Sequence, residues 1–292
     1  MSGLNFLNKL LDGVDVEWLS LGELGDFIRG NGLQKKDFVE SGFPAIHYGQ
    51  IYTRYGLSAD KTFTYVLPEL ANKLRKAQKN DLLLATTSEN DEDVVKPLAW
   101  LGDNVAISGD MMLFRHEQNV KYLAYFFQSE IFQTQKMKYI TGAKVRRVSS
   151  GDLSKIKIPI PCSNNPEKSL AIQSEIVRIL DKFTALTAEL TAELNMRKKQ
   201  YNYYRDQLFS FKEGEVEWKA LGEIGEVRMC KRILKSQTSS EGEIPFYKIG
   251  TFGKEPDSYI SRKLFNEFKE KYSYPKVGEV LISASGTIGR TV

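Results

Sequence analysis

One segment of this sequence occurs twice, 200 residues apart. VEWLSLGELGD (Val16 to Asp26) returns as VEWKALGEIGE (Val216 to Glu226), and 7 of the 11 positions are identical. Two further matches follow in the same order: Pro44 and Gly49 with Pro245 and Gly250, and KNDLLLATTS (79–88) with KVGEVLISAS (276–285). Solenoid repeats are about 20 to 50 residues long, so a repeat at this spacing is a whole domain with its connector. The sequence therefore predicts a first repeat, a spacer and a second repeat.

The second repeat ends soon after its last match, whereas the first repeat continues. The chain stops at Val292, and the first repeat runs on from Ser88 as far as Pro161. We therefore expect the chain to be truncated within its second repeat. The predicted domains are a first repeat at residues 1–161, a spacer at 162–213 and an incomplete second repeat at 214–292.

Composition predicts an ordinary globular protein. Its 292 residues are enough for two domains of about 100 to 200 residues each. There is no run of ~18 apolar residues and no secretory signal at the N-terminus, so we expect a cytoplasmic protein without membrane contact. Cys162 and Cys230 stand outside any CxxC or Cys/His cluster, which argues against structural zinc and against a disulfide framework. The net charge of +4 permits nucleic acid as a partner without requiring it.

The spacer has the composition of one long helix. Between Glu167 and Ser210 no Gly or Pro interrupts 44 residues, and at about 1.5 Å per residue such a helix spans about 65 Å. Its apolar residues recur at coiled-coil spacing, with a stutter after Leu190. The seam consists of Ile172, Ile176, Ile179, Phe183, Leu186, Leu190, Leu194, Tyr201 and Leu208. The stripe either docks on its own domain or pairs with an antiparallel helix, from this chain or from another; the length favours a partner for at least part of it.

The first repeat predicts an α+β fold with a strand-rich half. Short strands are expected at residues 43–53, 81–87, 94–101, 104–108 and 111–116. Helical patterns cover Leu67 to Gln78 and Val120 to Lys138. The segment Lys144 to Pro161 then alternates and stops on two prolines before the spacer helix.

No catalytic apparatus is recognisable. SASGTIGR (283–290) lacks the lysine of a phosphate-binding loop, and the one Asn-Pro pair, Asn165-Pro166, is followed by Glu rather than by the motif of an amino-methyltransferase. Neither His47 nor His116 stands beside a nucleophile that occurs in both repeats. The acidic run Glu89 to Val95 has no counterpart in the second repeat and is interpreted as a solvated loop rather than as a metal site.

The strongest local charge suggests a nucleic-acid surface. Between Ile131 and Ile160 there are seven basic residues and one acidic residue, which suits phosphate binding or, alternatively, a solubilising face. Segment His47 to Gly56 adds side chains that hydrogen-bond base edges, and its counterpart in the second repeat differs, as two readers of different sequences would. The predicted DNA-binding residues are His47, Gln50, Tyr52, Arg54, Thr86, Thr87, Ser88, Lys144, Arg146 and Arg147.

Taken together, these segments resemble the DNA-specificity subunit of type I restriction-modification systems. The resemblance rests on VEW-x2-LGE-x-G at the start of each repeat, on Gly142 to Pro161 at the end of the first, and on AIQSEIVRILDKF (171–183) in the spacer. It covers essentially the whole chain, and the order of the segments makes it more specific than any one of them.

The resemblance implies a function. In that family two target-recognition domains each read half of a bipartite DNA site, and two long antiparallel helices fix the gap between the halves. It implies a non-catalytic subunit that binds double-stranded DNA, carries methyltransferase (modification) subunits and joins motor-nuclease (restriction) subunits. S-adenosylmethionine, ATP and Mg²⁺ are then cofactors of those partners, and none is expected in this chain.

Other interpretations remain open on the sequence. Because the second recognition domain is incomplete and a second long helix is absent, two chains that pair through the seam would restore the architecture as a homodimer. Two alternatives are a coiled-coil adaptor without DNA binding and an inactive truncated specificity subunit. A methyltransferase in its own right would require the isolated chain to bind S-adenosylmethionine.

Overall fold

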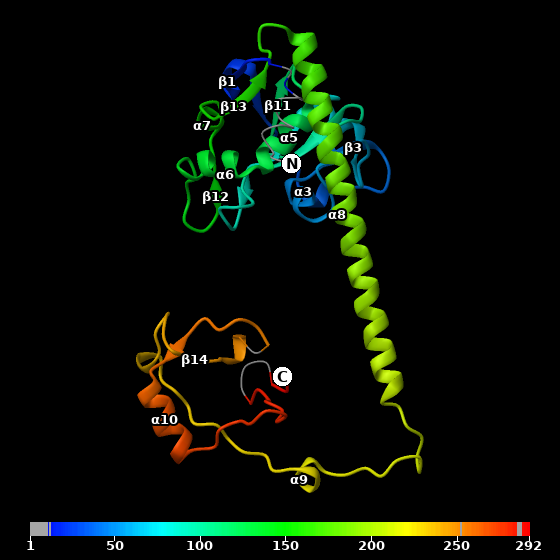
Figure 1. The fold of residues 1–292 in the computed structure, drawn as a ribbon. Helices are drawn as coiled ribbons and strands as arrows, with labels where there is room; N and C mark the ends of the chain where they lie inside the picture. Colours follow the sequence, from blue (N-terminus) through cyan, green and yellow to red (C-terminus); the bar gives the residue numbers. More distant parts are fainter. Residues whose placement is uncertain (1–10, 12, 252, 285–287) are drawn as a thin grey trace. The chain divides into compact units, whose positions relative to one another are not determined.

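The computed structural model describes residues 11, 13–251, 253–284 and 288–292. It divides after Tyr201 into an N-terminal unit (Met1–Tyr201) and a C-terminal unit (Asn202–Val292). The described residues have the mixed α+β fold with one long helix that the sequence predicted (Figure 1). None of their helices is both long and apolar enough to cross a membrane.

The repeated VEW segment opens the N-terminal unit as strand β1 (Val16–Ser20). It pairs antiparallel with β13 (Lys157–Pro161), so the start of the first repeat lies beside its last strand. Helix α2 (Leu21–Leu24) follows directly, and the carboxylate of Glu23 accepts hydrogen bonds from the backbone N and Oγ of Ser20 at 2.7 and 2.6 Å. This capping box defines where the strand ends and the helix begins.

Two sheets form the body of the N-terminal unit. The larger has the strand order β2-β11-β7-β9-β4 and the smaller β5-β3-β10-β6. The strands of the larger sheet are β2 (Gly25–Arg29), β4 (Ser58–Ala59), β7 (Leu82–Ala85), β9 (Lys96–Trp100) and β11 (Met111–His116), and those of the smaller are β3 (Phe43–Ile46), β5 (Thr64–Val66), β6 (Lys76–Ala77) and β10 (Val105–Ile107). All pairs are antiparallel except β4 with β9 and β3 with β10.

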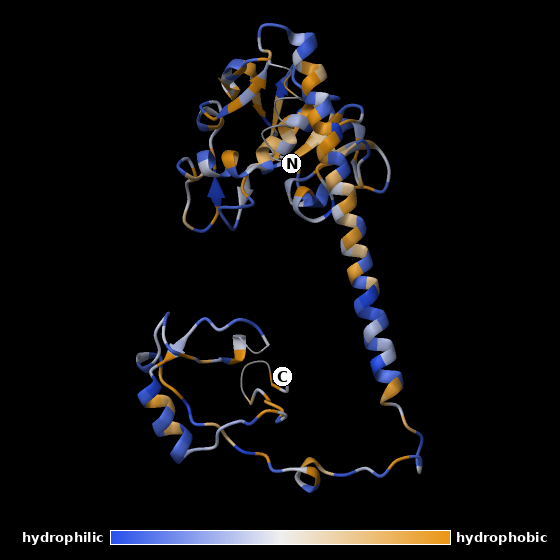
Figure 2. Cartoon of the chain, viewed as in Figure 1, coloured by the Kyte–Doolittle hydropathy of each residue, from blue (hydrophilic) through white to orange (hydrophobic). Residues whose placement is uncertain are grey.

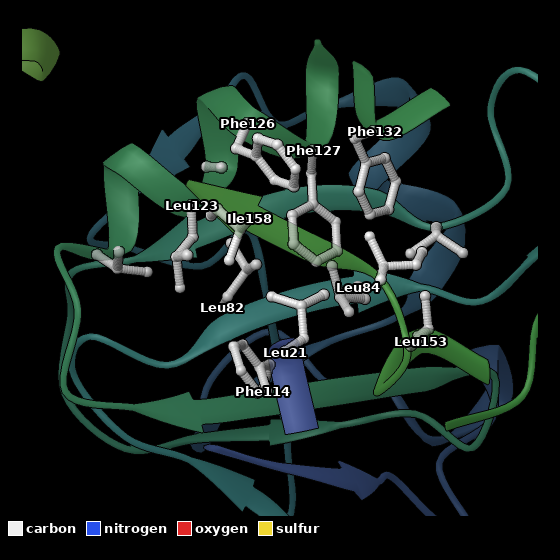
Figure 3. Close-up of a cluster of buried hydrophobic side chains, with 14 of the residues drawn as sticks. Leu21, Leu82, Leu84, Phe114, Leu123, Phe126, Phe127, Phe132, Leu153 and Ile158 are labelled. Atoms are coloured by element: carbon white, nitrogen blue, oxygen red, sulfur yellow. The ribbon is translucent and has the colours of Figure 1, made fainter. Parts of the chain in front are cut away.

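The core lies on both faces of the larger sheet. Successive side chains of a strand point to opposite faces, so Leu82 and Leu84 of β7 enter one apolar cluster while Leu83 enters another. Helices α5 (Val120–Gln128) and α6 (Glu130–Met137) contribute Phe127 and Phe132 to the first cluster, with ring centroids 4.1 Å apart (Figure 3). Because the sheet is covered on both sides, the central strand is apolar throughout rather than alternating.

The strand expected at residues 43–53 is only half correct. After β3 the chain turns into helix α3 (Tyr48–Thr53). The reason is local: the imidazole Nδ1 of His47 accepts a hydrogen bond from Gly49 N at 3.2 Å, and Gln50 Oε1 accepts one from His47 N at 2.9 Å. Two reciprocal side-chain bonds begin a helix that the apolar alternation of the segment does not indicate.

The predicted helices also need correction. Where a helix was expected from Leu67 to Gln78, α4 covers only Pro68–Ala71, because Lys76 and Ala77 leave it to pair with β10 as β6. The expected helix from Val120 to Lys138 is two helices. Ser129 separates them, since its Oγ donates to Phe126 O at 2.6 Å and accepts from Phe132 N at 3.3 Å, which ends α5 and caps α6. Between these helices and β13 lie the short elements β12 (Arg146–Arg147) and α7 (Ser150–Leu153).

The spacer forms helix α8 (Pro166–Leu208), as the sequence predicted. Its first part packs on the N-terminal unit and buries four side chains, which are Ser169, Ile172, Gln173 and Val177. Every residue from Lys182 to Tyr201 is exposed, and apolar residues recur along this stretch (Figure 2). The helix therefore has a first part that packs within its own domain and a second part whose side chains are exposed.

The C-terminal unit repeats the start of the N-terminal one. Helix α9 (Leu221–Ile224) corresponds to α2, and β14 (Ile244–Pro245) pairs with β15 (Tyr259–Ile260) as β3 pairs with β5. Helix α10 (Arg262–Lys271) follows. Of the hydrophobic side chains described in this unit, Ile260 alone is buried. The same local elements thus form here without the apolar core of the first repeat.

We expect Gly25→Ala to destabilise the N-terminal unit by roughly 3 kcal/mol, near the upper end for an overpacked site. A Cβ at this position would overlap the carbonyl O of Arg115, which belongs to the neighbouring strand. The duplication supplies the control, because a Cβ at the equivalent Gly225 meets no described atom within 4 Å. Urea denaturation of both variants measures the difference, and equal losses would contradict the packing argument.

Acid should destabilise the fold through His116. Burial lowers the pKa of His116 from its usual 6.5 to about 4, so the unfolded chain takes up this proton first. Stability is therefore lost as the pH falls from 6.5 to 4, by about 3 kcal/mol in total. His116→Asn retains an acceptor for Gln118 N, which His116 Nδ1 accepts at 3.1 Å, and should remove this component of the pH dependence. If the free energy of unfolding of both proteins fell equally with decreasing pH, a contribution of His116 to acid sensitivity would be excluded.

Candidate nucleic-acid interface

The structure brings together three segments that the sequence separately predicted to bind DNA. Strand β8 (Thr87–Ser88) pairs antiparallel with β12, with Ser88 opposite Arg146 and Thr87 opposite Arg147. Helix α3 is attached to the same place, because Tyr52 reaches the backbone of β8. Both α3 and β12 lie at the same end of the N-terminal unit (Figure 1). One surface therefore carries the predicted base-reading and phosphate-binding segments.

Tyr52 holds this surface together. Its hydroxyl lies 2.9 Å from Thr87 O and 3.2 Å from both Ala85 O and Asp93 O, so three backbone carbonyls, from β7, β8 and the loop after β8, converge on one donor. Burial raises the pKa of the Tyr52 hydroxyl far above its usual value, which keeps it protonated and able to donate. Its contacts are those of a positioning residue rather than of a reader of bases.

The side chains of His47 and Gln50 also form hydrogen bonds within the fold, which use most of their polar atoms. Besides the capping box, Gln50 Nε2 donates to Thr64 Oγ1 at 3.2 Å. His47 is buried to 9% exposure, and burial followed by the charge of Lys35 lowers its pKa. Because Nδ1 of the imidazole already accepts a hydrogen bond, the neutral ring carries its proton on Nε2 and is a donor there.

Arg54 is exposed at the end of α3 and has an aromatic neighbour that the sequence argument missed. The Cζ atom of Arg54 lies 5.8 Å from the ring centroid of Phe63, and the Phe63 side chain is itself 55% exposed. An exposed cation over an exposed ring suits stacking on sugar or base. The only signal in the sequence was a single Phe two residues after Lys61, which is too weak to single out.

The residues of β8 and the position before it face inward more than expected. Thr86 Oγ1 donates to Asp110 O at 3.0 Å, and Thr87 is buried with a hydroxyl that finds no partner among the described residues. Ser88 is half-buried, and its Oγ accepts from Asn90 N at 3.3 Å. Ser88 is thus the member of this trio that is open to a ligand.

The basic segment presents fewer unpaired cations to solvent than its composition suggested. Lys144 and Arg147 are exposed and form no ion pair within the described part of the chain. Arg146 Nε instead lies 2.8 Å from Asp91 Oδ1, and Lys155 pairs with Asp152 at 2.8 Å. The cations that face solvent without an ionic partner in this segment therefore include Lys144 and Arg147 but not Arg146.

Lys136 was counted in the basic segment, but it does not belong to the exposed surface. It is fully buried, and its Nζ donates to the carbonyl oxygens of Glu92 and Val94 at 2.9 Å each. Burial lowers its pKa to about 8. A lysine at this spacing looks like part of a surface run, but the tertiary fold uses it to hold the acidic loop.

That acidic loop, Glu89 to Val95, lies against the candidate surface. Lys136 and Tyr52 donate hydrogen bonds to backbone carbonyls of this loop, and Arg146 forms an ion pair with its Asp91 carboxylate. Val95 has φ of +69°, an unusual value for a β-branched residue, and its N donates to Ala85 O at 2.8 Å. The loop is anchored, whereas the sequence suggested only a solvated turn. No group of His, Cys, Asp or Glu within the described ranges is arranged to hold a metal ion.

The predicted helix-pairing residues fall into two groups. At the start of α8, Ile172 is buried, and Ile176 and Ile179 are partly buried. These three residues therefore face the N-terminal unit or lie at the edge of its contact with α8. The remaining members of the seam are 50–74% exposed: Phe183, Leu186, Leu190, Leu194, Tyr201 and Leu208. The stripe open to a partner helix begins at Phe183.

Comparison with known protein families places the chain clearly. Residues 13–197 and 213–292 both match the model of the type I restriction modification DNA specificity domain. The two matches cover both repeats, in agreement with the duplication in the sequence.

Individual relatives agree. A protein of Haemophilus influenzae named as a type I restriction enzyme specificity subunit is 38% identical over 98% of this chain and 70% of its own length. A type I restriction enzyme specificity subunit of Escherichia coli is 45% identical over 86% of this chain, which spans 57% of that relative. The crystal structure of a type I restriction-modification system S subunit from M. genitalium matches 96% of this chain and 69% of its own, with a TM-score of 0.50 at 16% identity, which supports the fold alone.

Loss of one hydroxyl should loosen the candidate surface. We expect Tyr52→Phe to lower the free energy of unfolding by about 1–2 kcal/mol, because buried carbonyls lose their donor. Tyr48→Phe is the control, since the Tyr48 hydroxyl makes no hydrogen bond to the described residues. Urea denaturation compares the stabilities, and amide exchange at Thr87 reports whether β8 opens. Equal behaviour of the two variants would refute the positioning role.

Proposed function

Because the chain belongs to the type I restriction-modification DNA-specificity family, we propose that it is a sequence-specific DNA-binding scaffold whose N-terminal unit reads one half of a bipartite site. By family it is a specificity subunit and not a catalytic one. The observation that carries the proposal is the pairing of β8 with β12, which joins the base-reading and phosphate-binding candidates on one surface.

Phosphate contact is the first task of such a surface. Arg147 lies in strand β12 and Lys144 lies two residues before that strand; both are exposed, and neither forms an ion pair within the described ranges. Cations of this kind release the counterions of DNA and set the register of the protein on the duplex without reading sequence. Arg146 joins them when DNA phosphate replaces Asp91 as its partner.

Base reading then falls to the side chains that remain open around α3 and β8. Arg54 donates to guanine O6 and N7, and Ser88 serves either base of a pair. Tyr52, Gln50 and Thr86 hold these groups in place through the hydrogen bonds described above. In this proposal the predicted contact residues divide into readers and supports.

The exposed stripe of α8 supplies the spacer. Its apolar side chains from Phe183 onward fit an antiparallel helix, either of a longer partner or of a second copy of this chain in a homodimer. The scaffold would carry methyltransferase subunits and recruit motor-nuclease subunits, and S-adenosylmethionine, ATP and Mg²⁺ would act in those subunits. Cytoplasmic DNA is the natural target of such a complex.

Salt dependence of DNA binding tests the proposal. We expect Lys144→Ala combined with Arg147→Ala to weaken binding to duplexes of any sequence and to reduce the slope of log K against log salt by about 2, near 1 per phosphate contact. The control, Lys198→Ala with Lys199→Ala, removes the same charge from the exposed part of α8. Fluorescence anisotropy between 50 and 200 mM salt measures both slopes.

The competing interpretation makes the opposite prediction. A coiled-coil adaptor without DNA binding would show no affinity for duplex DNA at any of these salt concentrations. Equal slopes for the two double variants would remove Lys144 and Arg147 from the interface.

A further inference from the structure

Gln173 is a fully buried polar residue in the first part of α8. Its Oε1 accepts from Asn119 N at 3.0 Å, and its Nε2 donates to Gln118 Oε1 at 2.7 Å and to Ser169 Oγ at 3.0 Å. Gln118 and Asn119 immediately precede α5, so one amide joins the spacer helix to the start of a core helix. Both amide hydrogens and one oxygen lone pair are used.

A second anchor lies two turns further along α8. Asp181 Oδ2 lies 2.6 Å from Lys121 Nζ, and Asp181 Oδ1 accepts from the Tyr125 hydroxyl at 2.7 Å. Tyr125 also lies 3.1 Å from Thr184 Oγ1. Lys121 and Tyr125 are one turn apart on α5, so the two anchors hold α8 against α5 at two separate heights.

The apolar contacts around these anchors are less directional. Ile172, Ile176 and Val177 pack on the core of the N-terminal unit, but hydrophobic contact is non-directional and tolerates small rotations. Hydrogen bonds require distances and angles within narrow limits. Buried polar residues are known to specify register between packed helices for this reason.

A small change in the direction of α8 at the anchors produces a large displacement at its far end. Every residue from Lys182 to Gln200 is exposed, and beyond the Tyr125–Thr184 contact no hydrogen bond or ion pair described for residues 185–200 joins α8 to another element. The 20 residues from Lys182 to Tyr201 span about 30 Å at about 1.5 Å each. A tilt of about 10° at the anchors would move the far end by about 5 Å, which exceeds the ~3.4 Å step of one base pair.

We propose that Gln173 and Asp181 are positioning residues that fix the direction in which the spacer helix leaves its recognition domain, and thereby the gap between DNA half-sites that the assembly accepts. The second half of this statement rests on the proposed function, and the first half does not. The residues act through α8 and touch no DNA themselves.

Distances within the full chain test the first half. Spin labels are attached at Lys73→Cys and Lys198→Cys, both exposed positions, in a Cys230→Ser background; Cys162 is buried. We expect pulsed electron paramagnetic resonance to give one narrow distance distribution for this protein. Gln173→Leu and Asp181→Asn should each broaden it or shift its mean by about 5 Å, the displacement expected for a 10° tilt.

A matched control separates direction from stability. Glu175→Gln removes the ion pair of Glu175 with Arg178, which lies within α8 and does not reach α5, so the distance distribution should stay unchanged. Asp181→Asn changes only a partly exposed group and keeps the test open if Gln173→Leu does not fold. An unchanged distribution in a folded Asp181→Asn or Gln173→Leu protein would overturn the proposal.

Selection of bound duplexes from a random pool tests the second half. Asp181→Asn should shift the preferred number of base pairs between half-sites by one or two, or broaden it, while the Glu175→Gln control retains the original gap. A changed label distance with an unchanged gap would overturn the link to DNA spacing. Because the label distances need no DNA, a chain that bound none would refute the proposed function and leave the distance result standing.

Discussion

The antiparallel pairing of β1 with β13 is the contact on which the N-terminal unit depends. It joins Val16–Ser20 to Lys157–Pro161, so the first strand of the repeat and the segment that leads into α8 form one small sheet. The C-terminal unit shows what the pairing does. Residues 216–220 read VEWKA, yet they form no strand among the described residues, which contain no counterpart of β13. Strand formation here follows from the presence of a pairing partner and not from intrinsic preference.

The same closure positions the two candidate surfaces. Because β13 runs directly into the loop before α8, the helix starts beside α5 and its first part becomes part of the core. The paired strands β8 and β12 lie elsewhere on the unit and carry exposed cations beside an anchored acidic loop. Carboxylates at the edge of a basic surface weaken non-specific attraction to phosphate, and a duplex must then supply matching contacts to be retained. Specific binding benefits from that balance more than from maximal positive charge.

Sequence reasoning succeeded where a signal was long or repeated. The duplication, the family resemblance, the α+β class and the 43-residue helix α8 all follow from patterns over many residues. It failed where one local contact decided the outcome. His47 with Gln50 turned an apparent strand into α3, and Ser129 divided one helical pattern into two. In the candidate site, Arg54, Lys144 and Arg147 are exposed as predicted. The sequence did not show that Lys136 is buried, that Arg146 is ion-paired, or that Phe63 is exposed beside Arg54.

The sequence by itself determined that this protein consists of a repeated domain joined by a long amphipathic helix, because periodicity and repetition are properties of the chain alone. Only the tertiary structure decided which polar groups remain available. Tyr52, Gln173 and Lys136 are ordinary polar residues in the sequence, and each becomes a support because distant backbone or side-chain atoms arrive within hydrogen-bonding distance. Burial of a polar group is tolerated where such partners are present, and their presence depends on contacts between residues far apart in the chain.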